Sequence, residues 1–86
     1  MQAQANLSTV PLAEVYKRLG RPNPSIALTV SRLHERGNAY SYAGVYNVVR
    51  GRVTFNAAVA EVFLEVAAEL LAKHEALAAK ARQLAA

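Results

Sequence analysis

The chain of 86 residues has no cysteine, no tryptophan and only two histidines. Without cysteine there is no disulfide framework, no zinc finger, no iron–sulfur cluster and no reactive thiol. His34 and His74 lie far apart in the sequence and outside any ligand spacing such as His-x-x-x-His. We therefore expect no metal site and no other cofactor.

Long uncharged hydrophobic runs are also lacking. The most apolar region, residues 57–72, carries Glu61, Glu65 and Glu69, whereas a membrane-spanning helix needs about 20 apolar residues with few or no charges. Residues 1–9 are polar and uncharged, unlike the basic start and apolar stretch of a signal peptide. These features predict a soluble, cytoplasmic protein that does not associate with membranes.

The residue patterns of common enzyme sites are missing too. The four glycines are isolated from one another, so no glycine-rich loop is present to cradle a phosphate. The serines have no convincing base and orienting partner, and the acidic residues of the last third are spread along the chain rather than paired. We predict that the protein is not an enzyme and binds no small-molecule ligand.

What the chain does have is a hydrophobic content of 53% and an uneven distribution of charge. Its length and composition are those of one small globular domain. Residues 1–53 carry seven basic and two acidic side chains, hence +5, and residues 54–86 carry three basic and four acidic ones, hence −1. A basic first part and a nearly neutral second part are typical of a polyanion-binding head joined to an assembly module.

Apolar residues recur at helical spacing, and no segment alternates with a period of two, so the sequence predicts an all-α fold. Prolines, glycines and capping residues divide it into four helices, at about 10–19, 24–36, 41–50 and 55–84. We expect Thr9, Asn23 and Thr54 to cap the first, second and last helices.

Helical spacing also sorts side chains into inner and outer faces. In the second helix Ile26, Val30 and Leu33 form the apolar stripe, and Thr29 falls on a more polar side with Arg32 and Arg36. In the third helix the inner positions are Val45, Val48 and Val49, and one outward stripe consists of Ala43, Tyr46, Asn47 and Arg50.

The last helix repeats apolar residues at a spacing near 3.5 for almost four heptads, and Glu69 can pair with Lys73 along it. A helix of about 30 residues is about 45 Å long, more than the diameter of so small a head. We expect a head of about residues 9–66 and an extension of about 67–86 that forms a homodimer; a solvated tail or another protein partner are the alternatives. The residues expected at the dimer contact are Leu70, Leu77, Ala81 and Leu84.

The second and third helices, joined by a tight turn, form a helix-turn-helix pattern. Residues 40–52, YSYAGVYNVVRGR, resemble the recognition helix of the lambda-repressor and Cro-like superfamily. Val45 matches its central buried aliphatic residue, Val48 the one three positions on, and Arg50-Gly51 the polar residue and glycine that close the helix. The resemblance covers about residues 25–65 and implies a small helical DNA-binding domain.

A recognition helix needs a slim, polar outer face that enters the major groove of double-stranded DNA. Ala43 and Gly44 keep the start of the third helix slim, Asn47 can pair with adenine, and Arg50 can pair with guanine or reach a phosphate. The spacing favours plain solvated positions for Arg32 and Arg36, and a partly buried one for Tyr42, over contact with DNA. The residues expected to contact DNA are Ser41, Tyr42, Ala43, Tyr46, Asn47, Arg50, Arg52, Arg32 and Arg36.

These observations predict a sequence-specific transcriptional regulator of Cro or repressor type, which binds an inverted repeat as a homodimer. Dimers of this kind read half-sites about one helical turn apart. Two alternatives remain open at this point. One is a helical protein-interaction module in which the last helix is the functional surface, and the other is an architectural protein that binds DNA without sequence preference.

Overall fold

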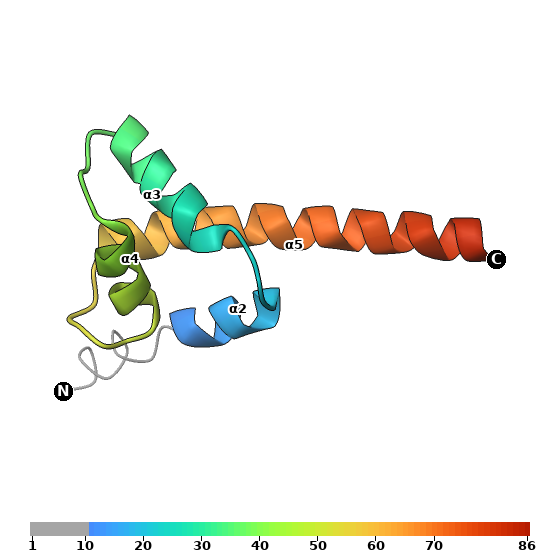
Figure 1. The fold of residues 1–86 in the computed structure, drawn as a ribbon, viewed down its shortest axis with the longest axis horizontal. Coiled ribbons are helices and arrows are strands. Elements are labelled where there is room, and N and C mark those ends of the chain that lie inside the picture. The colour runs from blue at the N-terminus through green and yellow to red at the C-terminus, as the bar shows by residue number, and fades with distance from the viewer. Residues whose placement is uncertain (1–10) are drawn as a thin grey trace.

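The computed structural model describes residues 11–86, which form four helices and no strand. The fold is therefore all-α with a long last helix, as predicted (Figure 1). In the part of the chain that is described, no helix is long and apolar enough to cross a membrane. The helices, labelled as in Figure 1, are α2 (Leu12–Leu19), α3 (Ser25–Glu35), α4 (Tyr42–Val49) and α5 (Ala57–Ala85).

Capping residues set the starts of these helices. The side chain of Asn23 accepts a hydrogen bond from the backbone N–H of Ser25 at 2.9 Å, as expected. The helix begins one residue later than predicted, however, so Pro24 and not Asn23 holds the N-cap position. Ser41 caps α4 by accepting from the N–H of Gly44 at 3.0 Å. The position of Thr9 lies outside the described residues.

The prediction that Thr54 caps the last helix is wrong. Asn56 holds that position, and its side-chain oxygen accepts from the backbone N–H of Val59 at 3.1 Å. The side-chain amide of Asn56 also donates to the hydroxyl of Tyr40 at 3.0 Å. The cap of α5 is thereby tied to the segment that leads into α4, a contact between distant parts of the sequence.

The core forms where α2, α3 and α4 pack on the first half of α5. Phe63 at its centre is completely buried. The predicted inner residues Leu33, Val45 and Val49 are buried as well, and Val48 packs against them. Other buried hydrophobic residues are Leu12, Ile26, Val59, Ala60, Val62, Val66 and Ala67.

Thr29 was expected on the polar side of its helix, but it is fully buried. Its hydroxyl donates to the backbone oxygen of Ser25 one turn earlier, at 2.7 Å. This bond satisfies the hydroxyl without a partner outside the helix, so the buried position carries no unpaired donor.

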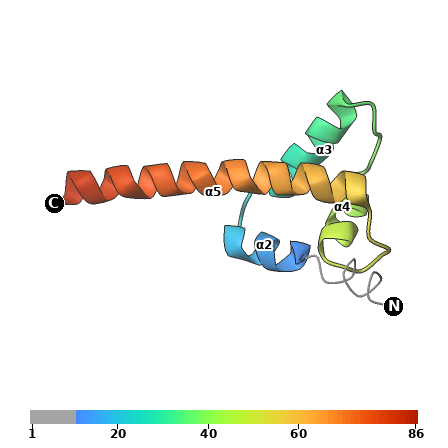
Figure 2. The ribbon, with the colours of Figure 1, turned by 180° about the vertical axis from the view of Figure 1, so that it is seen from behind.

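The helix α5 is much longer than the head that packs on it. The head lies on one side of α5, in front of it in Figure 1 and behind it in Figure 2, and covers its first half. Beyond Leu71 the side chains of α5 are almost all exposed, including Leu77 and Leu84. The described part of the chain therefore consists of a packed head and a projecting second half of α5.

Candidate nucleic-acid interface

The helix α4 shows the division into faces that a recognition helix requires. Val45 and Val49 are buried against the core, whereas Tyr42 and Ala43 are exposed and Asn47 is half-buried on the outer side. The structure places Ser41, the cap, at the exposed start of the helix. The predicted contact residues of α4 thus share one side of the head, together with Arg50 and Arg52 directly after it.

Tyr46 is less exposed than the sequence pattern predicts, because three aromatic rings cluster on the outer side of α4. Its ring meets that of Tyr16 from α2 edge-on, with centroids 6.0 Å apart and an interplanar angle of 81°. The ring of Tyr42 stacks with that of Tyr46, with centroids 6.5 Å apart and an interplanar angle of 16°. Such aromatic pairs are stabilising beyond the area they bury, so Tyr46 links α4 to α2.

Two arginines lie against this tyrosine cluster. The Nη1 atom of Arg50 donates to the hydroxyl of Tyr46 at 3.2 Å. The guanidinium carbons of Arg50 and Arg52 lie 5.7 Å and 5.8 Å from the centroid of the Tyr46 ring, within the range of a cation–π interaction. The ring therefore holds two positive charges at the end of α4 without neutralising them.

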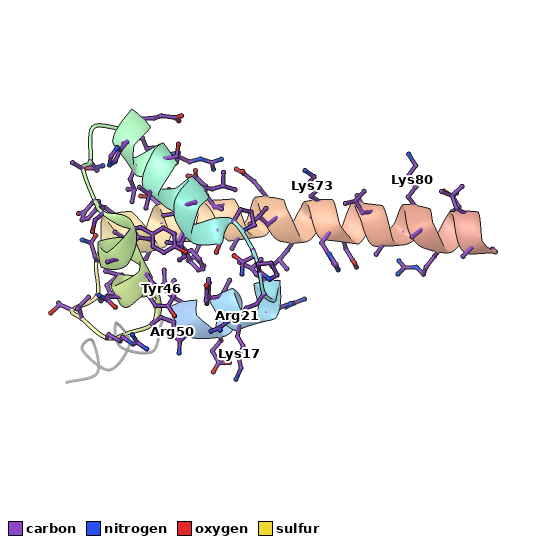
Figure 3. The ribbon with its side chains drawn as sticks, viewed as in Figure 1. Lys17, Arg21, Tyr46, Arg50, Lys73 and Lys80 are labelled. Carbon is purple, nitrogen blue, oxygen red and sulfur yellow. The ribbon has the colours of Figure 1, made fainter. Side chains whose placement is uncertain are left out.

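A groove of about 430 Å³ runs between α2 and the end of α4. Figure 3 shows Lys17, Arg21 and Arg50 gathered around it with Tyr46, on the side of the head away from Lys73 and Lys80. A second hollow adjoins it and is lined by Tyr42 and Tyr46 as well as Arg21. The carboxylate of Glu14 also lines the first groove, so the surface is basic but not exclusively so.

Sequence reasoning counted Lys17 in the net charge but did not place it at the interface. Lys17 and Arg21 are four residues apart and follow Tyr16 on the first helix and the turn after it. Arg21 lies beyond the end of α2, so helical spacing does not place it beside Lys17, but both side chains line the same groove. Only the packing of α2 against α4 shows that this groove adjoins the predicted contact residues.

Arg32 and Arg36 have different surroundings from the other predicted contact residues. Arg32 forms ion pairs with Glu69 at 2.9 Å and with Glu65 at 3.2 Å. Arg36 pairs with the same oxygen of Glu65 at 2.7 Å. These bonds join α3 to α5, and they replace the predicted pair between Glu69 and Lys73 by a contact between helices.

The pKa values of these groups follow from the pairing. The pKa of Glu65 lies below its ordinary value, chiefly because Arg36 donates to the carboxylate and also because Arg32 does, and burial partly opposes the shift. The hydrogen bonds from Arg32 lower the pKa of Glu69 in the same way. In turn, the bonds to Glu69 and Glu65 raise the pKa of Arg32. Both carboxylates are therefore charged at neutral pH.

The pairing divides the charge of the head between two sides. Within residues 11–86, none of the cations that surround the tyrosine cluster forms an ion pair, and residues 1–10 contain no acidic side chain. The positive charge near α3 is balanced by the carboxylates of α5. Of the five remaining cations of the head, four lie along α2, α4 and their adjoining turns, namely Lys17, Arg21, Arg50 and Arg52. The fifth, Arg18, lines a hollow between the end of α2 and α5.

The predicted dimer residues lie along one face of α5. Leu70 packs against the edge of the core, whereas Leu77, Ala81 and Leu84 are exposed on the projecting half. The exposed fractions of Leu77 and Leu84 are 58% and 80%. These leucines have no covering element among the described residues and form an exposed apolar surface that is separate from the basic side of the head.

Residues 11–86 bring together no group of three or more histidine or acidic side chains that could hold a metal ion. Comparison of the chain with family models, with curated proteins and with solved structures finds no match.

Proposed function

We propose that the protein binds double-stranded DNA through α4 and regulates transcription at a specific sequence. The observation that supports this most is the separation of charge in the head. The arginines of α3 are balanced by carboxylates of α5, while four of the five other cations of the head gather around the exposed face of α4. Proteins that bind DNA concentrate unneutralised Lys and Arg where the phosphates run.

The residues of this surface suit different parts of the DNA. Ala43, near the start of α4, leaves room for close approach to the major groove. Asn47 carries the amide group that pairs with adenine, and Arg50 the planar donor that pairs with guanine. Lys17, Arg21 and Arg52 flank α4, where they would contact the phosphates on either side of the groove.

Arg32 and Arg36 are not part of the proposed surface. A phosphate contact from either would have to break ion pairs to Glu65 and Glu69, and those carboxylates would repel the same phosphate. We assign these arginines the role of holding α3, the first helix of the helix-turn-helix, against α5.

The experiment that tests the proposal is selection from a random duplex DNA pool at about 150 mM salt, near physiological ionic strength. We expect enrichment of one short sequence motif, whose binding Arg50→Ala weakens and Arg36→Ala does not. Binding without enrichment would instead indicate an architectural protein, which reads shape and charge only. A folded protein that binds no duplex would contradict the proposal and favour an interaction module that acts through α5.

A further inference from the structure

The projecting half of α5 continues the face that carries the core. Phe63, Leu70, Leu77 and Leu84 recur at intervals of seven residues, which places them on nearly the same side of a helix. Phe63 is buried beneath the head, Leu70 lies at its edge, and the last two are exposed. The exposed leucines therefore lie on the same side of α5 as the head, which covers the first half of the helix.

This face is broad and uncharged between residues 70 and 86. At 100° per residue it covers roughly 140° of the circumference, and His74 is its one member that is not apolar. It consists of Leu70, Leu71, His74, Leu77, Ala78, Ala81, Leu84 and Ala85. Lys73 and Lys80 border it along one edge, and Figure 3 shows both pointing away from the basic side of the head.

A hollow of about 420 Å³ lies where this face meets the head. The end of α2 and the turn after it form one wall, with Arg18, Leu19 and Pro24, and α5 forms the other with Leu71 and His74. The hollow extends the apolar face at its inner end. A helix that packed along the projecting half of α5 would therefore end against it.

We infer that this face binds the same face of a second copy of the chain, with the two α5 helices antiparallel. This pairing deepens the proposed function because it defines how two DNA-binding heads are joined. Only its consequence for DNA, the spacing of the half-sites, rests on the proposed function. The observation that selects the orientation is the position of the head. A parallel partner helix would continue into the space that α2 and α3 occupy beside residues 57–70 (Figures 1 and 2).

The antiparallel arrangement avoids this collision because the two heads lie at opposite ends. Pairing residues 71–86 of both copies places the two-fold axis near residue 79. Leu77 then packs on Ala81 of the second copy, and Leu84 of the second copy lies opposite His74, beside the hollow. The face is free of acidic and strongly basic groups, so it can meet its own copy without burying an unpaired formal charge.

The same geometry directs both basic surfaces to one side. The two-fold axis of antiparallel helices is perpendicular to the plane that contains both helices. The second helix lies in front of α5 in the view of Figure 3, on the side that the head occupies, so this plane is horizontal and the axis is vertical. The basic groove lies below α5 in that view, and rotation about a vertical axis keeps it below. Both recognition surfaces would thus face the same DNA, with Lys73 and Lys80 on the far side.

The distance between the heads follows from the length of α5. The helix α4 packs beside the first turns of α5 (Figure 1). The path from residue 58 to the axis near residue 79 is about 30 Å at 1.5 Å per residue, so the two α4 helices are about 60 Å apart. Two turns of DNA measure about 70 Å and one turn about 35 Å. We therefore expect half-sites two turns apart, about 20 base pairs, rather than one.

The test of pairing needs no DNA. We expect sedimentation of the full chain at micromolar concentrations to give a dimer. Leu77→Asp should raise its dissociation constant at least about 100-fold, because each copy then brings an uncompensated charge into the apolar contact. Ala76→Asp adds the same charge on the opposite side of α5 and should leave the dimer intact. A wild-type chain that stays monomeric up to about 100 μM would overturn the inference.

Orientation is tested by disulfide cross-linking, which is clean in a chain without cysteine. A mixture of His74→Cys and Leu84→Cys chains, one of them tagged to change its mass, should form the mixed disulfide. Neither chain should cross-link to itself efficiently, because identical positions would lie about 15 Å apart along the helices, beyond disulfide reach. Efficient self-linking of each variant would indicate parallel helices and contradict the inference.

The experiments distinguish a failure of the pairing from a failure of the proposed function. If monomeric Leu77→Asp still binds a single half-site, DNA binding holds whatever the pairing. If the wild-type chain dimerises as inferred but binds no duplex in the selection, the pairing holds and the proposed function fails. If the motif has half-sites one turn apart, the antiparallel arrangement is wrong although DNA binding is right.

Discussion

The arginines on the two sides of the head have the same chemistry but opposite surroundings. On the α3 side, Arg32 and Arg36 face carboxylates of α5 and are held in ion pairs. On the α4 side, Arg50 and Arg52 face the ring of Tyr46, which positions a guanidinium group and leaves its charge available. The comparison shows why net charge alone does not locate a binding surface: what matters is which cations the fold leaves unbalanced.

The largest difference between the two sides is expected in binding to the selected DNA sequence. We expect Asn47→Ala and Arg50→Ala each to weaken it by roughly 1–3 kcal/mol, because each removes a group suited to bidentate pairing with a base. Arg36→Ala is the matched control and should leave the affinity unchanged. Titration of labelled duplex measures all three, and equal losses for Arg36→Ala and Arg50→Ala would remove the distinction between the two sides.

The role of Tyr46 in positioning Arg50 sharpens the comparison. Tyr46→Phe removes the hydroxyl that accepts from Arg50 but keeps the ring. We expect affinity for the selected sequence to fall by about 0.5–1.5 kcal/mol, the net value of a typical hydrogen bond. Binding to unrelated duplex should change less, since a phosphate contact tolerates a looser arginine. An equal loss on both DNAs would show that the hydroxyl does not position Arg50 for a base.

The cations of the groove should contribute without regard to sequence. We expect Lys17→Ala and Arg21→Ala to weaken binding to all duplexes alike. Each should lower the slope of log affinity against log salt by about one, because each removes one phosphate contact. Arg32→Ala serves as the control on the opposite side of the head. A salt slope that Arg32→Ala lowers as much as Lys17→Ala does would contradict the charge separation.

The smallest effect is expected in stability, on the α3 side alone. The pKa values of Glu65 and Glu69 are lowered in the folded protein. Their pairs therefore stabilise the fold above the ordinary pKa of 4.5, and this stabilisation is lost as the pH falls through the lower folded values. The groups are solvent-exposed, so melting of the wild type should show an extra loss of no more than a few degrees between about pH 5 and pH 3.

Glu65→Gln tests this pH dependence, because it removes one carboxylate and keeps the shape of the side chain. The variant should melt slightly lower than the wild type at pH 7 and should lose less stability on acidification. Melting curves followed by circular dichroism give the comparison. Identical pH profiles for the two proteins would show that the ion pairs do not couple folding to protonation.

Several features of the fold could be predicted from local sequence. The helical spacing of Val45 and Val49 predicted the buried face of α4, and the position of Asn23 predicted that its side chain accepts a hydrogen bond at the start of α3. These predictions hold because the periodicity of side chains and the hydrogen bonds of the first turn depend on neighbours within a few residues. The predicted start of α5 was wrong because two residues that can cap a helix, Thr54 and Asn56, lie close together in the sequence. The structure has Asn56 as the cap, and its side chain also contacts Tyr40.

The candidate site was predictable only in part. The residues of α4 could be chosen because they share one helix, but their environment comes from α2. Tyr46 was expected to be more exposed than it is, since nothing in its own helix indicates the edge-on contact with Tyr16. Lys17 was not assigned to the surface for the same reason.

The sequence by itself determined the helices, their inner faces and the excess of positive charge in the first part of the chain, because each depends on residue type and short-range spacing. Only the tertiary structure decided which of those charges are balanced. Arg32 pairs with Glu65 and Glu69 across more than 30 residues of intervening chain. Ion pairing depends on the distance between the charges in space. Once a turn separates two residues, their spacing along the sequence no longer determines that distance.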